Sequence, residues 1–151
     1  MIYLEEAIIL ATKAHAGQID KAGVPYIMHP LRVASKMKSE AAMIVAVLHD
    51  VVEDTDVTMQ DLQKIFDADV LLAVNALTKV KGEPYSDYLM RVAMAPLAID
   101  VKIEDIKDNM DIGRIKYPSQ ADYERFRKYE DALMYLEFVQ KKINVIKATV
   151  G

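Results

Sequence analysis

The side chains best suited to chemistry gather in the segment AVLHDVVEDT, residues 46–55. His49 and Asp50 are adjacent, and Glu53 and Asp54 follow within about one helical turn. Residues four apart on a helix are neighbours, so His49 would lie beside Glu53, and Asp50 beside Asp54. Burying an ionised carboxylate is costly unless it is paired or bound to a metal. Four ionisable groups at the end of an apolar helix therefore indicate a site.

Two other segments supply polar groups of the same kind. Pro30 fits the first turn of a helix and is expected to push His29 out of the helical region, at the entrance. Lys102, Asp105 and Asn109 follow one another at intervals of three and four residues, beside an apolar stripe on another expected helix. Polar groups at the border of a core often line a cleft, so we expect both segments to reach the same place.

The candidate metal ligands are two imidazoles and two carboxylates, from His29, His49, Asp50 and Asp105. This donor set suits a first-row divalent metal that keeps open positions for water and substrate. Taken singly, each residue is equally explained as a structural histidine or a solvated carboxylate. The prediction therefore depends on whether the fold brings all four together.

The elements that must position these groups are predicted to be helices, because apolar residues recur at intervals of three and four. The segments expected to be helical are 3–16, 30–37, 40–53, 58–66, 68–77, 86–94, 96–111 and 119–147. A loop with two glycines and a proline occupies residues 17–28. No segment has a convincing strand pattern, so the expected fold class is all-α.

Composition limits the kinds of partner. The chain has 151 residues, of which 52% are hydrophobic, which suits one domain with a sizeable core. Its net charge of −4 disfavours a general nucleic-acid binder but leaves a small anionic ligand open. The chain has no cysteine, no signal-peptide pattern and no apolar run long enough to span a bilayer. We expect a cytoplasmic protein with a small-molecule partner, with oligomerisation left open.

Four motifs occur in order: AHAGQIDKAGVPYIMHPLRVA (14–34), AVLHDVVEDT (46–55), ALTK (76–79) and VKIEDIKDNM (101–110). Together they resemble the HD superfamily of metal-dependent phosphohydrolases, and within it the hydrolase domain of RelA/SpoT proteins and small stand-alone alarmone hydrolases. The resemblance covers about residues 4–112. It implies a single-domain HD-type helical bundle over residues 1–151, in which a C-terminal helix at about 119–147 packs on the motif-bearing part.

The resemblance implies specific roles for the residues of the cluster. One divalent metal, commonly Mn²⁺, would be held by His29, His49, Asp50 and Asp105. Glu53 and Asp54 match the acidic pair that the family links to activation of the attacking water. Glu53, one turn beyond a ligand, is placed to take the proton of that water.

The resemblance also implies where the substrate binds. Lys21 and Tyr26 match loop residues near the nucleotide, and Asn109 matches an asparagine that holds the substrate near the metal. Lys79 matches the lysine of a TK turn in the family. Lys79, Arg91 and Lys102 could neutralise the transferring phosphoryl group, although a solvated surface charge explains Arg91 equally well. The family's reaction is removal of pyrophosphate from the ribose 3′-oxygen of guanosine tetra- or pentaphosphate by a metal-activated water.

Two departures separate this chain from the larger enzymes. Asp20 stands where those enzymes have an arginine that can stack on guanine, and DIKDN replaces DRLHN, which introduces Ile106 and Asp108. The alternatives are therefore an HD phosphohydrolase for another nucleotide, such as ppApp, a nucleoside 3′-phosphate or a dNTP, and a catalytically silent nucleotide-binding sensor. His15 fits the family pattern without a metal role, and we expect it to be structural or to orient the loop.

Overall fold

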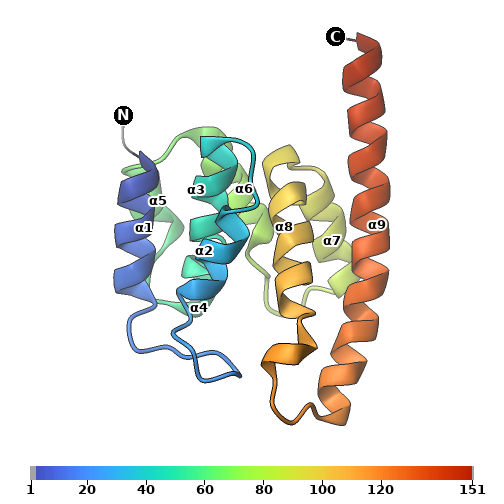
Figure 1. Ribbon diagram of the computed structural model, residues 1–151. Coiled ribbons are helices and arrows are strands. Elements are labelled where there is room, and N and C mark those ends of the chain that lie inside the picture. The colour runs from blue at the N-terminus through green and yellow to red at the C-terminus, as the bar shows by residue number, and fades with distance from the viewer. Residues whose placement is uncertain (1–2, 151) are drawn as a thin grey trace.

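The computed structural model describes residues 3–150, which form helices joined by short connections (Figure 1). The helices are α1 (Tyr3–Ala14), α2 (Met28–Ala34), α3 (Glu40–Leu48), α4 (Val51–Asp54), α5 (Met59–Gln63), α6 (Ala68–Leu77), α7 (Tyr85–Ala93), α8 (Pro96–Asn109), the short 3-10 helix η1 (Ile112–Arg114) and α9 (Gln120–Val150). Within the described residues, β pairing is limited to an isolated bridge between Ile19 and Pro25. The all-α prediction is confirmed.

Helix α3 lies at the centre of the bundle because it is apolar on nearly every side. Ser39 caps it by accepting a hydrogen bond from the backbone amide of Ala42 at 3.2 Å. Residues 44–48 are all buried, and α1, α2, α6 and α8 pack around the helix. A central helix of this kind fixes the position of whatever follows its last turn, which is His49.

The expected helix over residues 40–53 is interrupted, so the prediction of one continuous helix is wrong. Helix α3 ends at Leu48 and α4 begins at Val51. Asp50, between them, has φ −107° and ψ −4°, in the sparsely populated bridge region. Successive side chains of a regular helix point about 100° apart. The turn instead brings the side chains of His49 and Asp50 to the same point, where they contact partners from other helices.

Helix α2 begins earlier than expected. The prediction that Pro30 keeps His29 out of the helix is wrong, because α2 begins at Met28 and includes His29 in its first turn. A turn is already formed here, since the amide of His29 donates to the carbonyl oxygen of Tyr26 at 2.9 Å. The preference against helical geometry before proline is a bias that this local hydrogen bonding overcomes. His29 does lie at the helix entrance, as predicted.

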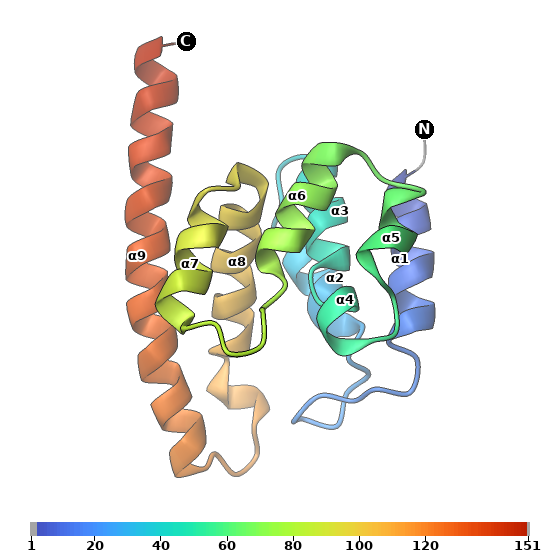
Figure 2. The same cartoon turned by 180° about the vertical axis from the view of Figure 1, so that it is seen from behind.

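Helices α8 and α9 form the other side of the bundle (Figures 1 and 2). Pro96 occupies the first turn of α8, and Ile99, Ile103 and Ile106 are buried against the core as expected. Helix α9 packs on α7 and α8, with residues as far along as Ile143 packed against the core, and its C-terminal end extends past the rest of the bundle. No helix within residues 3–150 has both the length and the apolar character needed to cross a membrane.

One end of the bundle collects the elements that carry the predicted site residues. The loop after α1, the turn into α4, the C-terminal end of α8 and the start of α9 all lie at the lower end in Figure 1. These segments are separated by up to about a hundred residues in sequence, as the contact between Lys21 and Asp122 shows. The site is therefore a product of the tertiary fold. The extent of the single domain, residues 1–151, stays a prediction.

Candidate active site

The four predicted metal ligands converge below the end of α3. His29 Nε2 lies 2.9 Å from Asp105 Oδ1 and 3.8 Å from Asp50 Oδ2. His49 Nε2 lies 2.9 Å from Asp50 Oδ2 and 3.4 Å from Asp105 Oδ1. His29, His49 and Asp105 are at most 4% exposed. The fold thus gathers two imidazoles and two carboxylates from α2, the α3–α4 turn and α8.

Both imidazoles are held so that Nε2 faces the shared point. His49 Nδ1 lies 2.6 Å from the carbonyl oxygen of Ala46, and His29 Nδ1 lies 2.6 Å from Asp108 Oδ2. An imidazole that donates through Nδ1 keeps a lone pair on Nε2 when it is neutral. His49 Nε2 is buried without a hydrogen-bond partner among the described residues. A divalent cation would satisfy this atom, and the nitrogen and carboxylate donors suit such an ion.

Asp105 occupies the centre of the charge network. Its Oδ2 accepts from Lys102 Nζ at 2.8 Å, and its Oδ1 accepts from Asn109 Nδ2 at 3.0 Å. Burial opposes ionisation, but the charge of Lys102, together with the two imidazoles beside the carboxylate, holds the pKa of Asp105 well below its usual range. The carboxylate is therefore charged at neutral pH and able to act as a ligand.

Tyr26 fixes the Asp50 carboxylate, because its hydroxyl donates to Asp50 Oδ2. Burial and then the charge of Asp50 raise the pKa of Tyr26 far above its usual value, so the hydroxyl stays a donor. For Asp50 itself, burial raises the pKa, but the neighbouring His49 outweighs it and the pKa is lowered. Tyr26 thus positions a ligand candidate as well as lining the pocket described below.

His15 joins the loop to α4 through two hydrogen bonds. Its Nδ1 lies 2.8 Å from Gln18 Oε1, and Gln18 Nε2 donates to the carbonyl oxygen of Asp54 at 3.0 Å. The His15 ring also lies 5.0 Å from the ring of Tyr26, centroid to centroid. These contacts agree with the loop-orienting role expected from the sequence.

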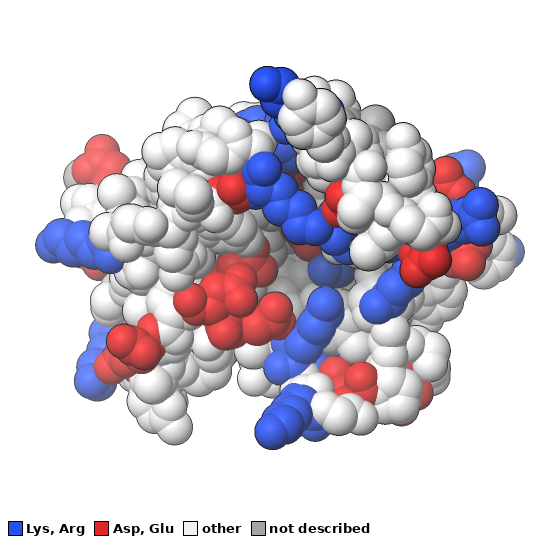
Figure 3. Space-filling model, turned by 90° about the horizontal axis from the view of Figure 1, so that it is seen from below, with Lys and Arg blue, Asp and Glu red and all other residues white. Residues whose placement is uncertain are grey.

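A second acidic group lies beside the ligand cluster. Asp50, Glu53 and Asp54 each place a carboxylate oxygen within 4.8 Å of the other two. Glu53 Oε1 accepts from the backbone amide of Lys79 at 2.9 Å, which fixes its direction. Burial, followed by the charges of Asp50 and Glu53, raises the pKa of Asp54. Figure 3 shows acidic side chains facing basic ones across a hollow on this end of the molecule.

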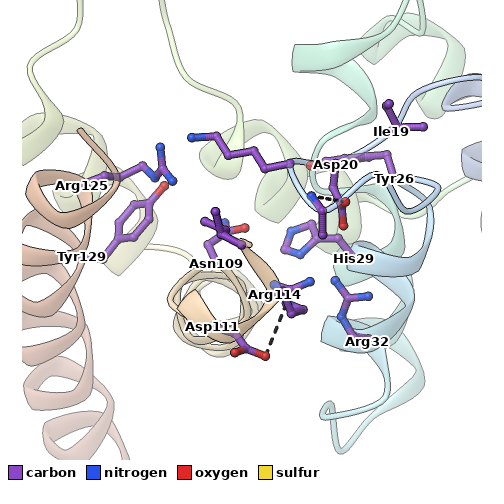
Figure 4. Close-up of a pocket in the computed structure, with 13 residues that line it drawn as sticks. Ile19, Asp20, Tyr26, His29, Arg32, Asn109, Asp111, Arg114, Arg125 and Tyr129 are labelled. Atoms are coloured by element: carbon purple, nitrogen blue, oxygen red, sulfur yellow. Dashed lines mark hydrogen bonds and ion pairs between the residues drawn. The ribbon is translucent and has the colours of Figure 1, made fainter. Parts of the chain in front are cut away.

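A pocket of about 390 Å³ opens beside His29 (Figure 4). Arg125 and Tyr129 of α9 form one side, and Tyr26 and His29 form the other, with Asn109 between them. The pocket residues are Ile19, Asp20, Lys21, Ala22, Tyr26, His29, Arg32, Asn109, Asp111, Arg114, Ile115, Arg125 and Tyr129. Four of them, Lys21, Tyr26, His29 and Asn109, were expected from the sequence, and the polar groups Arg32, Arg114, Arg125 and Tyr129 were not.

The loop over residues 17–28 is attached to α9 through Lys21. Lys21 Nζ lies 2.8 Å from Asp122 Oδ1, in the first turn of α9. Asp20 Oδ1 accepts from the backbone amides of Ala22 and Val24 at 2.8 and 3.0 Å, so this oxygen serves the loop's own conformation. Asp20 therefore lines the pocket, and this position has no cationic side chain that could stack on a base.

Asp108 is a functional candidate that the sequence marked only as a departure. Besides His29, its carboxylate accepts from Arg32 Nε at 2.8 Å and Nη2 at 3.0 Å, and Arg114 Nη2 lies 3.3 Å away. Burial raises its pKa, but the hydrogen bonds from His29 and Arg32 lower it far below its usual range. A metal-binding imidazole commonly donates its other N–H to a carboxylate, which orients the ring. Asp108 makes this contact with His29 across 79 positions of sequence.

Arg91 makes contacts that stabilise the fold. Its Nε and Nη2 pair with the two carboxylate oxygens of Glu83 at 2.7 and 2.8 Å, and Nη2 also donates to the carbonyl oxygen of Thr78 at 3.0 Å. These bonds support the turn that carries Lys79. The expected contact of Arg91 with substrate stays a prediction, whereas Lys102 lies directly against Asp105.

A family model described as "HD domain" matches residues 7–98. This range contains His29, His49, Asp50 and the Glu53–Asp54 pair, and it ends before Asp105. The fourth ligand candidate is therefore supported by the geometry described above and by the sequence motif around it.

Curated relatives carry names from one group of enzymes. The chain is 33% identical over 119 residues to "Guanosine-3′,5′-bis(diphosphate) 3′-pyrophosphohydrolase" of Aquifex aeolicus, and 34% over 122 residues to "Bifunctional (p)ppGpp synthase/hydrolase SpoT" of Escherichia coli K12. It is 34% identical over 120 residues to "GTP pyrophosphokinase" of Streptomyces coelicolor. Each match covers 71% of this chain, but only 17%, 17% and 14% of the respective relatives.

A solved structure has the same fold. It is described as "A metazoan ortholog of SpoT hydrolyzes ppGpp and plays a role in starvation responses", and it matches with a TM-score of 0.75. The match covers 97% of this chain and 96% of the other, at 23% sequence identity. This likeness extends over α9 as well as over the motif-bearing helices.

Proposed function

This chain belongs to the HD domain family, as its motifs predict, and we propose that it is a metal-dependent phosphohydrolase of alarmone nucleotides. The proposed reaction removes pyrophosphate from the ribose 3′-oxygen of guanosine tetra- or pentaphosphate. The observation that carries the proposal is the convergence of His29, His49, Asp50 and Asp105 beside a pocket large enough for part of a nucleotide. The names of the relatives supply the substrate class.

The four convergent residues are proposed to hold one divalent cation, and we propose Mn²⁺. A bound cation of this kind supplies a water of lowered pKa and polarises a phosphoryl oxygen. The chain's own contribution is to orient the ligand side chains. The Ala46 carbonyl oxygen orients His49, the Asp108 carboxylate orients His29, and the Tyr26 hydroxyl orients Asp50. These supports hold the site in a single arrangement before substrate arrives.

Glu53 and Asp54 are proposed to take up the proton of the attacking water. Both side chains are exposed at the rim of the cluster, so they can meet a solvent-derived nucleophile. Glu53 is held by the Lys79 amide, and we assign it the role of general base. Asp54 is the neighbouring carboxylate, whose raised pKa favours proton uptake.

The nucleotide is proposed to lie in the pocket beside His29. Lys21, Tyr26 and Asn109 line it, and Arg125 and Tyr129 close it from α9. Cationic side chains on both sides suit the phosphates of a nucleoside diphosphate. Lys79 and Lys102 lie on the other side of Asp105 and are proposed to offset charge on the group being transferred, with Arg91 supporting them.

A second candidate is hydrolysis of an alarmone with another base, such as ppApp. The observation that favours it is Asp20, whose Oδ1 is hydrogen-bonded within its own loop where larger enzymes have a stacking arginine. Losing a stacking partner typically costs about 1–3 kcal/mol, which would weaken base preference by roughly ten- to a hundredfold. The expected cytoplasmic location, the absence of nucleic-acid binding and the oligomeric state stay predictions.

The test is a screen of phosphate and pyrophosphate release with added Mn²⁺, over ppGpp, ppApp, nucleoside 3′-phosphates and dNTPs. We expect ppGpp and ppApp to be hydrolysed with similar kcat/KM, and the other compounds to react far more slowly. Preference for a nucleoside 3′-phosphate or a dNTP would overturn the alarmone assignment. Binding of ppGpp without turnover in any metal would indicate the sensor instead.

A further inference from the structure

Three lysines from different parts of the chain converge on two tyrosine rings next to Asp105. Lys128 Nζ lies 3.9 Å from the centroid of the Tyr85 ring, and Lys79 Nζ lies 5.6 Å from it. Lys102 Nζ lies 5.2 Å from the centroid of the Tyr88 ring, and Lys79 Nζ lies 5.7 Å from it. The two rings are themselves 5.8 Å apart. A shared platform from α7 thus holds ammonium groups from the end of α6, from α8 and from α9.

The positive charge at this place is only partly compensated within the described residues. Lys102 pairs with Asp105 at 2.8 Å, whereas no carboxylate oxygen of the described residues lies within 4.0 Å of Lys79 Nζ or Lys128 Nζ. Glu53 accepts from the backbone amide of Lys79 rather than from its ammonium group. Burial and then the charges of Lys79 and Lys102 lower the pKa of Lys128, as expected where ammonium groups lie near one another.

A hydroxyl group at the same place also lacks a partner. Tyr88 donates its hydroxyl to the carbonyl oxygen of Leu77 at 2.8 Å, but the Tyr85 hydroxyl oxygen is buried and has no hydrogen-bond partner among the described residues. A buried polar atom without a partner is costly, so it points to a group that is bound there in use. The unpaired donors, one hydroxyl and two ammonium groups, all match the oxygens of a phosphate.

We propose that Lys128 and the Tyr85 hydroxyl, with Lys79 and Lys102, form a subsite for a pyrophosphate group. The inference rests on the proposed function and adds to it a binding residue from α9. None of the four lines the pocket beside His29. Asp105 lies between the two places, because its Oδ1 is 2.9 Å from His29 Nε2 and accepts from Asn109, which are pocket residues, while its Oδ2 accepts from Lys102.

This arrangement predicts how a substrate would lie. With the nucleoside in the pocket and the terminal phosphates at the subsite, the bond to be broken would fall beside Asp105 and the metal ligands. The anion would cancel the repulsion among the three ammonium groups and satisfy the Tyr85 hydroxyl. Because Lys128 is three residues from Arg125 on α9, one helix would contact both ends of the substrate.

The test measures binding of inorganic pyrophosphate by calorimetry to Mn²⁺-loaded protein freed of excess metal, so that turnover is not involved. Lys128→Gln should weaken binding about ten- to a hundredfold, the scale for a hydrogen bond to a charged group. Tyr85→Phe keeps the ring and should weaken binding about two- to tenfold. Arg127→Gln, the matched control, removes a positive charge from the neighbouring exposed residue and should change binding less than twofold.

Pyrophosphate that binds wild type and Lys128→Gln equally, or that does not bind wild type, would overturn the subsite. A matching loss in Arg127→Gln would show that only the general charge of α9 matters, and would overturn it as well. Thermal melts of the variants check that α9 remains folded. The outcome is separable from that of the proposed function, because a protein could bind pyrophosphate through Lys128 without hydrolysing ppGpp, and could hydrolyse ppGpp without using Lys128.

Discussion

At the scale of single residues, Asp108 determines how His29 can act. One carboxylate accepts from the imidazole and from the guanidinium of Arg32, so the ring is held in one orientation and one tautomer. Arg114 adds a third contact. In DRLHN the corresponding position is a histidine, which could not accept in this way while carrying both ring protons. The departure noted in the sequence is therefore part of a local network that supports the proposed metal centre.

Asp108→Ala is expected to weaken binding of Mn²⁺ by about ten- to a hundredfold, because His29 loses the acceptor that orients it. The measurement is a competition titration of the metal-free protein. Asp111→Ala is the control, since Asp111 is exposed and contacts only Arg114 of this network. Equal metal affinity in Asp108→Ala and wild type would show that His29 is oriented by packing alone.

Glu53→Gln is expected to keep the metal but to lower kcat by about a hundredfold or more, the usual scale for loss of a general base. The amide oxygen of glutamine can still accept from the Lys79 backbone amide, so the local geometry should survive. Metal content by elemental analysis and kcat on ppGpp are measured together. If kcat is unchanged while Asp54→Asn is slow, the base is Asp54.

The sequence predicted the ligand candidates but not their supports, and the reason is physical. His49 and Asp50 stand out because charge at the end of an apolar helix is unusual. Asp108 is an ordinary carboxylate at the end of a helix, and its role depends on a contact with His29 that only the tertiary fold creates. The partner of Lys21 is similarly distant, on α9.

At the scale of elements, the break between α3 and α4 shows what a local pattern cannot reveal. The apolar periodicity of residues 40–53 is that of an unbroken helix, and the helix-to-turn change at Asp50 follows from contacts with Tyr26 and the ligand cluster. Two helix starts, expected at residues 58 and 119, agree with the structure to within one residue, because capping is local. Thr58 and Asp61 form a capping box before α5, and Ser119 precedes α9 and accepts from the amide of Asp122.

Asp122 joins two elements, because it accepts from the amide and hydroxyl of Ser119 and from Lys21 in the loop. Lys21 and then the Ser119 groups hold the pKa of Asp122 far below its usual range. Asp122→Asn should therefore lower the Tm at neutral pH. A carboxyl whose pKa is depressed by folding stabilises above its unfolded pKa, about 3.9, and loses that contribution as the pH falls toward its folded pKa.

The measurement is the Tm difference between wild type and Asp122→Asn at pH 7 and at pH 3, where the difference should be smaller. Asp131→Asn, on an exposed position of the same helix, serves as the control and should show little difference at either pH. A Tm difference that is equal at both pH values would mean that the charge of Asp122 does not strengthen its contacts with Ser119 and Lys21.

At the scale of the whole molecule, α9 completes the site. It contributes Arg125 and Tyr129 to the pocket and Lys128 to the proposed subsite, although its position beside α7 and α8 could not be read from its own amphipathic pattern. The apolar spacing did predict a helix here, and the family resemblance implied that this helix packs on the motif-bearing part. Leu136 is one of the residues that fix it, since it is fully buried against the bundle.

Leu136→Ala is expected to lower the free energy of unfolding by about 2–5 kcal/mol, through lost burial and a residual cavity. Urea denaturation measures it, and Met134→Ala, at a position 72% exposed, should stay within about 0.5 kcal/mol of wild type. Nucleotide affinity should fall in Leu136→Ala while Mn²⁺ affinity is kept, because the metal ligands lie on other helices. Parallel loss of nucleotide affinity and Mn²⁺ affinity would mean that the helices carrying the ligand candidates depend on the packing of α9.

The central claim is that the cluster of His29, His49, Asp50 and Asp105 removes pyrophosphate from a 3′-phosphorylated nucleotide. Phosphorus NMR of ppGpp incubated with the Mn²⁺-loaded protein tests it most directly, because it identifies the first product as well as the rate. We predict that GDP and inorganic pyrophosphate appear together, and that Asp105→Ala, which should lose the metal while remaining helical, produces neither. Orthophosphate as the first product, or pyrophosphate release that persists in metal-free Asp105→Ala, would contradict the account.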